Sequence, residues 1–250
     1  MTDNGPLASL PQVRILPCGD TAIVVEFGDA IDRALNDLVL ALDENVRKAS
    51  PPGFVESVPT FRSLMIHYNP LVVSAEKLTL EVTSLLDQGH SSSRVATRWE
   101  IPVCYEIAHA PDLAFVAAQA GLREREVIAL HMEPEYHLYM IGFLPGYPYL
   151  GDLSEILRLP RRVSPREKVP AGSVAIAMAM TAIYPVESPG GWHLIGSTPI
   201  SLFDVSRTPP TLFAPGDKVK FEAIDHDRFE AIRGDVRAGR YTPRNSLVAK

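Results

Sequence analysis

The chain has 250 residues, of which 46% are hydrophobic and 8% aromatic, so it can bury one large core or two smaller ones. Its formal net charge of −6 disfavours non-specific binding to nucleic acid or to an anionic membrane. No apolar run approaches the roughly 20 residues that a bilayer span needs. The first residues also lack the basic and apolar regions of a signal peptide, so we expect a cytoplasmic protein.

Residues 12–90 predict a small α/β unit. The expected elements, in chain order, are strands at 13–16 and 21–27, a helix from Asp32, strands at 54–58 and 63–68, and a helix from Ser74. This order of strand, helix, strand, strand and helix is typical of a ferredoxin-like fold. A further strand near 99–105 either completes this unit or opens the next one, and the sequence leaves both readings open.

Residues 99–226 predict a second domain made mainly of strands. Two short helices come first, and from Glu135 onward short alternating runs are separated by turns rich in Pro and Gly. Such a pattern predicts a closed or nearly closed β-barrel. Residues 227–250 predict a charged C-terminal tail, whose pattern permits a helix near 227–237. The fold class is therefore α+β.

Residues 140–199 carry most of the functional information. They hold 8 of the 22 prolines and 7 of the 16 glycines, which predicts stiff loops of defined shape. Aromatic side chains beside such loops can form the wall of a small-ligand site, or they can simply pack the corners of a barrel. The aromatic residues in question are Phe143, Tyr147, Tyr149, Tyr184 and Trp192.

Several common site motifs are absent from the sequence. There is no GxxxxGK[ST] phosphate loop, no GxGxxG after a strand, and no HExxH or CxxC motif. Cys18 and Cys104 lie far apart, and no two histidines have ligand spacing, so we expect no metal site. Ser173 lies in Ala171-Gly-Ser-Val-Ala175, which is not a GxSxG nucleophile elbow, and a serine at a turn or strand start is the favoured interpretation.

Two groups of charged residues suggest chemistry. Within the basic run 158–168, Arg162 and Arg166 can bind a carboxylate or phosphate, or they can belong to an ordinary solvated loop. His131 and Glu135 can form a general acid–base pair, although a histidine at this position more often ends a helix.

Five sequence blocks, taken in order, resemble the KipI family, whose members are also called allophanate hydrolase subunit 1 or the 5-oxoprolinase B subunit (PxpB). The blocks are GFLPGYPYLG, PRRVSPR, VPAGSV, IYPVESPGGW and IGSTPISLFD, and the matching region covers roughly residues 99–222. The resemblance implies that the barrel of residues 99–226 is cyclophilin-like. It also implies substrate-binding roles for Gly142, Phe143, Pro145, Gly146, Arg162, Arg166, Ser173, Thr181, Tyr184, Pro189, Gly190, Gly191 and Trp192.

The family resemblance further implies a subunit of an ATP-dependent 5-oxoprolinase that acts with a KipA-like partner, similar to allophanate hydrolase subunit 2, and with a LamB/YcsF-like subunit. ATP would then be bound with the partner subunits, because this chain lacks a phosphate motif. Alternatives are an inhibitor of a sensor histidine kinase and a carboxyltransferase-type subunit of urea metabolism. Met178, Met180 and Ala182 stand where relatives commonly show Gly, Gln and Gly, so the substrate itself stays open.

Overall fold

A computed structural model describes residues 13–87 and 94–248. The chain forms two compact units, which we call unit 1 and unit 2, divided between Arg94 and Val95. Each unit has an apolar core of its own. No helix in these described ranges is long and apolar enough to cross a membrane.

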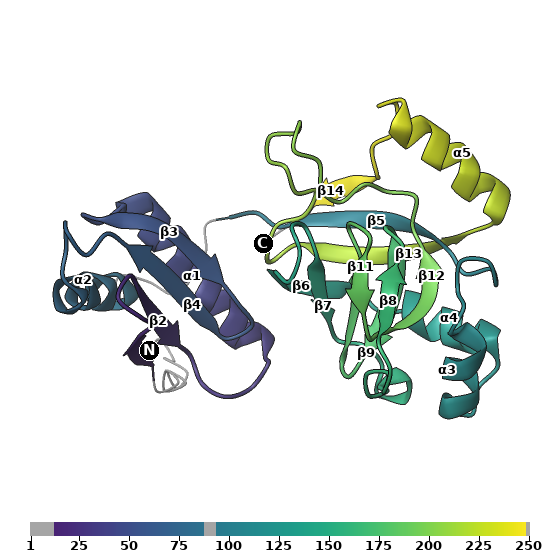
Figure 1. The fold of residues 1–250 in the computed structure, drawn as a ribbon, viewed down its shortest axis with the longest axis horizontal. Coiled ribbons are helices and arrows are strands. Elements are labelled where there is room, and N and C mark those ends of the chain that lie inside the picture. Colours follow the sequence, from purple (N-terminus) through teal and green to yellow (C-terminus); the bar gives the residue numbers. More distant parts are fainter. Residues whose placement is uncertain (1–12, 88–93, 249–250) are drawn as a thin grey trace, which may run out of the picture. The chain divides into compact units, whose positions relative to one another are not determined.

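Unit 1 is a four-stranded antiparallel sheet with two helices (Figure 1). Its elements are β1 (Arg14–Pro17), β2 (Ala22–Glu26), α1 (Arg33–Ala49), β3 (Phe54–Pro59), β4 (Ser63–Tyr68) and α2 (Ala75–Asp87). The sheet order is β1-β2-β4-β3. The ferredoxin-like prediction is therefore confirmed for the run from β2 to α2.

The edge strand of this sheet shows which unit contains the strand predicted near 99–105. In a ferredoxin-like unit the strand after the second helix pairs beside the first strand. Here β1 occupies that edge, with Leu16 opposite Val24 on β2. The strand after α2 is β5 (Thr97–Cys104), and it joins the sheet of unit 2 instead.

Local sequence explains the long helix of unit 1. The Asp32 carboxylate accepts hydrogen bonds from the backbone N–H groups of Ala34 and Leu35, at 2.8 and 3.2 Å, which satisfies two donors at the start of α1. Ser50 takes a left-handed conformation and ends the helix. The face between these caps packs Val46 and other apolar residues against the sheet.

Unit 2 is built around a barrel. After β5 its elements are α3 (Leu113–Ala120), α4 (Glu124–Met132), β6 (Tyr136–Ile141), β7 (Pro148–Gly151), the short 3₁₀ helix η1 (Glu155–Leu157), β8 (Arg166–Val169), β9 (Ser173–Ala177), β10 (Met180–Ile183), β11 (Ser188–Gly190), β12 (His193–Ser197), β13 (Lys218–Ile224), α5 (His226–Arg237) and β14 (Asn245–Leu247).

Seven strands close the barrel, in the order β12-β9-β10-β7-β6-β13-β5. Closure comes from the pairing of Ser197 on β12 with Cys104 on β5. Strands β5 and β13 run parallel, and the other neighbouring pairs are antiparallel. The predicted barrel is confirmed, and its closure removes the exposed sheet edges that an open sheet would leave.

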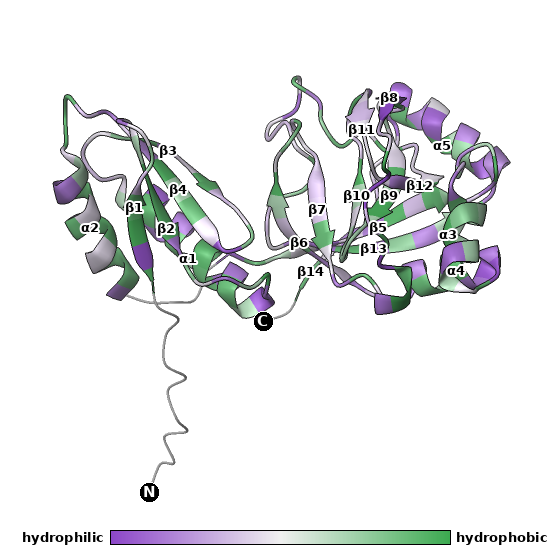
Figure 2. Cartoon of the chain, turned by 60° about the horizontal axis from the view of Figure 1, so that its bottom comes forward, coloured by the Kyte–Doolittle hydropathy of each residue, from purple (hydrophilic) through white to green (hydrophobic). Residues whose placement is uncertain are grey.

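The residues predicted as a charged tail, 227–250, are part of unit 2. Helix α5 is mainly hydrophilic (Figure 2), but it buries Phe229 and Ile232. Strand β14 pairs with β5, with Asn245 opposite Trp99. The prediction of a tail is corrected because a weakly apolar segment needs only a few buried residues and an available strand edge to dock.

Strands β8 and β11 form a separate antiparallel ribbon. Ser188 lies opposite Val169, and Gly190 lies opposite Arg166. Figure 1 shows the ribbon in front of the barrel strands. The ribbon brings the sequence blocks around 160–170 and 184–192 together.

Candidate functional site

Four aromatic residues from two of the sequence blocks meet at the barrel wall, and we call them the aromatic cluster: Tyr147, Tyr149, Tyr184 and Trp192. The Tyr147 ring centroid lies 5.0 Å from that of Tyr149, 5.1 Å from that of Tyr184 and 6.2 Å from that of Trp192. Most of these contacts are edge-on, which is the favoured arrangement of aromatic quadrupoles. These aromatic residues therefore do come together, and three of the four are buried.

The hydroxyl groups of the cluster are hydrogen-bond donors and acceptors, not nucleophiles. Tyr147 donates to the Tyr184 hydroxyl, which also accepts the backbone N–H of Trp192. Burial raises the pKa of Tyr147 far above its ordinary value, and it also raises the pKa of Tyr149 and of Tyr184. All three hydroxyls consequently stay protonated at neutral pH.

Gly190 and Phe143 shape the edge of the cluster. A Cβ atom on Gly190 would collide with the hydroxyl end of Tyr184, so only glycine lets the ribbon approach this ring so closely. Phe143 has a left-handed backbone (φ 67°) and a side chain that is 64% exposed, with its ring 5.5 Å from that of Tyr147. Phe143 is therefore an exposed aromatic at the edge of an otherwise packed cluster.

Arg162 and Arg166 both bind the carboxylate of Asp112. The distances to Oδ1 are 3.1 Å from Arg162 and 2.7 Å from Arg166, and the backbone N–H of Leu194 donates to Oδ2 at 2.7 Å. Desolvation alone would raise the pKa of Asp112, but the bonds from Arg166 and Leu194 outweigh it and the pKa is lowered. The carboxylate that these two arginines hold is thus one of the protein's own.

Asp112 with Arg162 and Arg166, which we call the clamp, positions the neighbouring loop. The backbone N–H of Arg162 donates to the carbonyl of Gly191 at 2.7 Å, next to Trp192. One nitrogen of each guanidinium, Nε of Arg162 and Nη1 of Arg166, is buried without a hydrogen-bond partner among the described residues. The clamp joins α3, the basic loop and β12 beside the aromatic cluster.

His131 lies in the barrel core and is fully buried. Its Nδ1 is 2.8 Å from the Tyr105 hydroxyl, and its Nε2 is 2.9 Å from Oγ1 of Thr181. The Thr181 hydroxyl donates its only proton to the carbonyl of Ala175, so it must accept a hydrogen bond from Nε2–H of His131. The other ring nitrogen, Nδ1, is then unprotonated and accepts from the Tyr105 hydroxyl. The ring also stacks on Phe221, with centroids 4.7 Å apart.

The predicted acid–base pair is therefore not formed. Burial lowers the pKa of His131 to about 3, so the imidazole stays neutral and both of its nitrogens are occupied. The Glu135 carboxylate instead binds Nε of Arg98 at 2.6 Å. Four residues of separation bring two side chains together only if the helix continues, and α4 ends at Met132, before Glu135.

Two predicted substrate contacts, Thr181 and Ser173, are buried in the structure. Thr181 is fully buried and committed to His131 and Ala175 inside the barrel. Ser173 is buried at the start of β9, where its backbone N–H donates to the carbonyl of Pro170. Of the remaining predicted residues, Pro145 in the loop before β7 and Pro189 in β11 are exposed.

The glycine-rich loops do not form a phosphate cradle. In the loop from Gly142 to Gly146, the N–H of Gly142 donates to the carbonyl of Tyr147, and the N–H of Leu144 donates to the carbonyl of Gly142. Gly146 is required for close packing on Phe203. These two backbone N–H groups therefore serve the loop itself.

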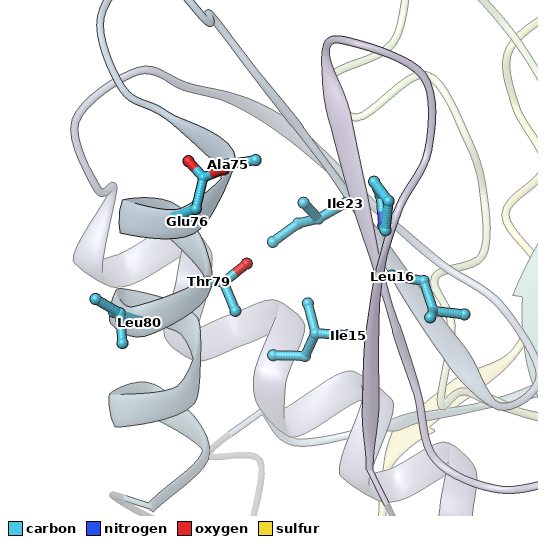
Figure 3. Close-up of a pocket in the computed structure, with 8 residues that line it drawn as sticks. Ile15, Leu16, Ile23, Ala75, Glu76, Thr79 and Leu80 are labelled. Atoms are coloured by element: carbon cyan, nitrogen blue, oxygen red, sulfur yellow. The ribbon is translucent and has the colours of Figure 1, made fainter.

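Two further features of the described residues lie outside the aromatic cluster. The described residues contain no group of three His, Cys, Asp or Glu side chains arranged to hold a metal ion. A shallow groove of about 430 Å³ in unit 1 lies between β1 and α2 (Figure 3). Its lining is apolar except for Glu76 and Thr79, which form no catalytic arrangement.

Sequence reasoning missed two residues. Asp112 was not singled out, although an acidic residue directly before a predicted helix is a recognisable signal. Arg161 was seen only as part of the basic run, yet its guanidinium carbon lies 6.0 Å from the centroid of the Trp192 ring. Its place within the Pro160-Arg-Arg162 motif gave no means of ranking it above its neighbours.

Residues 13–213 match the family model described as carboxyltransferase domain, subdomain C and D. The B subunit of 5-oxoprolinase from Bacillus subtilis (strain 168) is 40% identical over 231 residues, which cover 88% of this chain and 96% of the relative.

Two solved structures are also similar. The protein TTHA0988 superimposes with a TM-score of 0.75 at 38% identity, over 82% of this chain but only 40% of its own length. The urea carboxylase of Kluyveromyces lactis shares the fold at 19% identity, with a TM-score of 0.77 over 95% of this chain and 24% of the enzyme.

Proposed function

The chain belongs to the family of 5-oxoprolinase B subunits, and from this membership we propose that it is one subunit of an ATP-dependent 5-oxoprolinase. The observation that carries the proposal is 40% identity along nearly the whole length of a relative from this family. The enzyme would open the cyclic amide of 5-oxoproline to give glutamate. A KipA-like chain would be the second subunit, and a LamB/YcsF-like chain would be the third.

The proposed reaction needs more than this chain contains. A lactam resists attack by water until its carbonyl is polarised or phosphorylated, and ATP would supply that activation with release of ADP and phosphate. Neither a phosphate cradle nor an available acid–base pair lies beside the aromatic cluster within the described residues. This chain would therefore bind and orient substrate, and the partner subunits would hold ATP and transfer protons.

The exposed rim of the aromatic cluster suits a shared site. Phe143 projects from a shaped loop, and aromatic and arginine side chains are enriched at the centres of protein interfaces. A partner that covers Phe143 would also exclude water from the cluster, which strengthens polar interactions with a bound substrate.

A second candidate is a carboxyltransferase-type subunit, which the family-model match to a carboxyltransferase domain favours. In that case the carboxyl group would come from a carrier on another chain. The two candidates differ in product, because the first releases glutamate from 5-oxoproline and the second does not.

The test is co-expression with KipA-like and LamB/YcsF-like chains, followed by size exclusion and an assay of glutamate release from 5-oxoproline with and without ATP. We expect a stable complex and ATP-dependent release, with no release by the isolated chain. A complex that releases no glutamate would favour the carboxyltransferase candidate. Turnover by the isolated chain would overturn the shared site.

A pair of variants tests whether the rim of the cluster is the interface. Phe143→Ala should reduce recovery of the complex. Phe115→Ala removes another half-exposed aromatic from unit 2, whose ring stacks on that of His193 with centroids 5.2 Å apart, and it should leave complex formation unchanged. Equal recovery from both variants would place the interface elsewhere.

A further inference from the structure

Arg161 differs from the other cations of the basic run. Arg158 pairs with Glu155, Arg162 and Arg166 pair with Asp112, and Lys168 pairs with Glu187. Arg161 has no ion pair or hydrogen bond among the described residues, and its one described contact is with the face of Trp192, at 6.0 Å. An exposed guanidinium without a carboxylate partner is available to bind an anion.

The aromatic cluster surrounds this guanidinium on one side. The Tyr149 ring lies 6.1 Å from Trp192 and is only partly buried, so it presents a face at the surface. Burial raises the pKa of Tyr147, Tyr149 and Tyr184, and the positive charge of Arg161 lowers the pKa of each by a smaller amount. Arg161 therefore interacts electrostatically with the three tyrosines, and it lies over the ring of Trp192.

The backbone beneath Arg161 is held in place. Its neighbour Arg162 donates its backbone N–H to Gly191, and the Arg162 side chain is bound to Asp112. The free guanidinium thus extends from an anchored segment, so less conformational entropy is lost when it binds a ligand than from a mobile loop.

We propose that Arg161, with Tyr149 and Trp192, forms the site that holds a small carboxylate attached to a flat amide ring. The guanidinium fork, held over Trp192, binds the carboxylate through two hydrogen bonds, and the partly exposed ring of Tyr149 packs against the ring of the ligand. 5-Oxoproline belongs to this ligand class, so the assignment rests on the proposed function and names the part of the substrate that this chain recognises. Arg161 takes the role that the sequence had suggested for Arg162 and Arg166.

Binding of three probes to the full chain tests the site by calorimetry. 5-Oxoproline has the carboxylate and the ring, 2-pyrrolidinone has the ring alone, and inorganic phosphate has the charge alone. We expect Arg161→Gln to raise the Kd for 5-oxoproline by about tenfold to a hundredfold, the loss expected for hydrogen bonds between charged groups, and to leave binding of 2-pyrrolidinone unchanged.

The matched control is Arg158→Gln, which removes the same charge from an arginine three positions away that pairs with Glu155. It should bind all three probes as the wild-type chain does. Equal effects of the two substitutions would overturn the site, as would a wild-type chain that binds 5-oxoproline no better than 2-pyrrolidinone or not at all. Tighter binding of phosphate than of 5-oxoproline would also overturn the assignment to a carboxylate.

The assembled complex separates this proposal from the proposed function. If the complex releases glutamate and Arg161→Gln leaves its KM for 5-oxoproline unchanged, the function stands and the Arg161 site is wrong. If the chain binds 5-oxoproline through Arg161 but the complex releases no glutamate, the site stands and the proposed function is wrong.

Discussion

Nε2 of His131 lies 2.9 Å from Oγ1 of Thr181 in the interior of the barrel. The sequence had suggested one of these residues for proton transfer and the other for substrate binding. In the fold the two side chains are hydrogen-bonded to each other, and the chain of hydrogen bonds continues to Tyr105 on one side and to the carbonyl of Ala175 on the other. A buried network of this kind stabilises one packing arrangement, because each member would be costly to bury without its partner.

Removal of the His131 side chain should strongly destabilise unit 2. His131→Ala would leave a cavity and two hydroxyls without their partner, and we expect a loss of about 3 kcal/mol in the free energy of unfolding. Both tryptophans of the chain, Trp99 and Trp192, lie in unit 2, so urea unfolding followed by their fluorescence reports on this unit. Glu135→Gln, which affects only a surface ion pair, should cause little change. Equal losses would contradict the core role.

The stability of unit 2 should fall as the pH is lowered, in part because of His131. Its pKa is lowered from 6.5 to about 3 by burial, so the unfolded chain binds a proton that the folded chain excludes. The contribution is complete above pH 6.5 and is lost progressively as the pH falls toward 3. Between pH 7 and pH 5 the resulting loss in the free energy of unfolding is about 2 kcal/mol. His131→Gln should show a correspondingly weaker dependence, and the same dependence in both proteins would contradict a neutral buried imidazole.

The clamp at Asp112 should contribute measurably to stability. Asp112→Asn removes the charge that balances two partly buried arginines, and we expect a loss of about 2–4 kcal/mol, below the full cost of breaking a buried pair because the arginines are partly exposed. Glu187→Gln, which breaks the exposed pair with Lys168, is the control and should change little. Similar urea midpoints for the two variants would show that the clamp is not stabilising.

Met178 is a site for a stabilising substitution. It lies in the turn between β9 and β10 with a left-handed backbone (φ 54°) and a side chain that is 62% exposed. Met178→Gly places a residue that adopts positive φ without steric cost, and it should relieve about 0.5–1 kcal/mol of backbone strain. Met178→Ala removes the same side chain without relieving the strain, so only the glycine variant should unfold at higher urea concentration. A gain from alanine alone would point to the side chain instead.

The sequence by itself determined the elements whose signals are local. Apolar spacing and the cap at Asp32 predicted α1, and dense Pro and Gly predicted a barrel of short strands, because hydrophobic period, capping and turn chemistry each act within a few residues. Phe143, Tyr184 and Trp192 were selected as candidate site residues from an equally local signal, since they are aromatic residues within loops rich in Pro and Gly.

Only the tertiary structure decided which residues meet. Asp112 reaches Arg162 across 50 positions and Leu194 across 82, and no periodicity in a single sequence encodes such a pairing. The same is true of the placement of β5 in the barrel and of the burial of His131. Which charged side chains pair depends on their distance and solvation in the folded chain. In this fold Arg162 and Arg166 bind Asp112, whereas Arg161 has no carboxylate partner among the described residues.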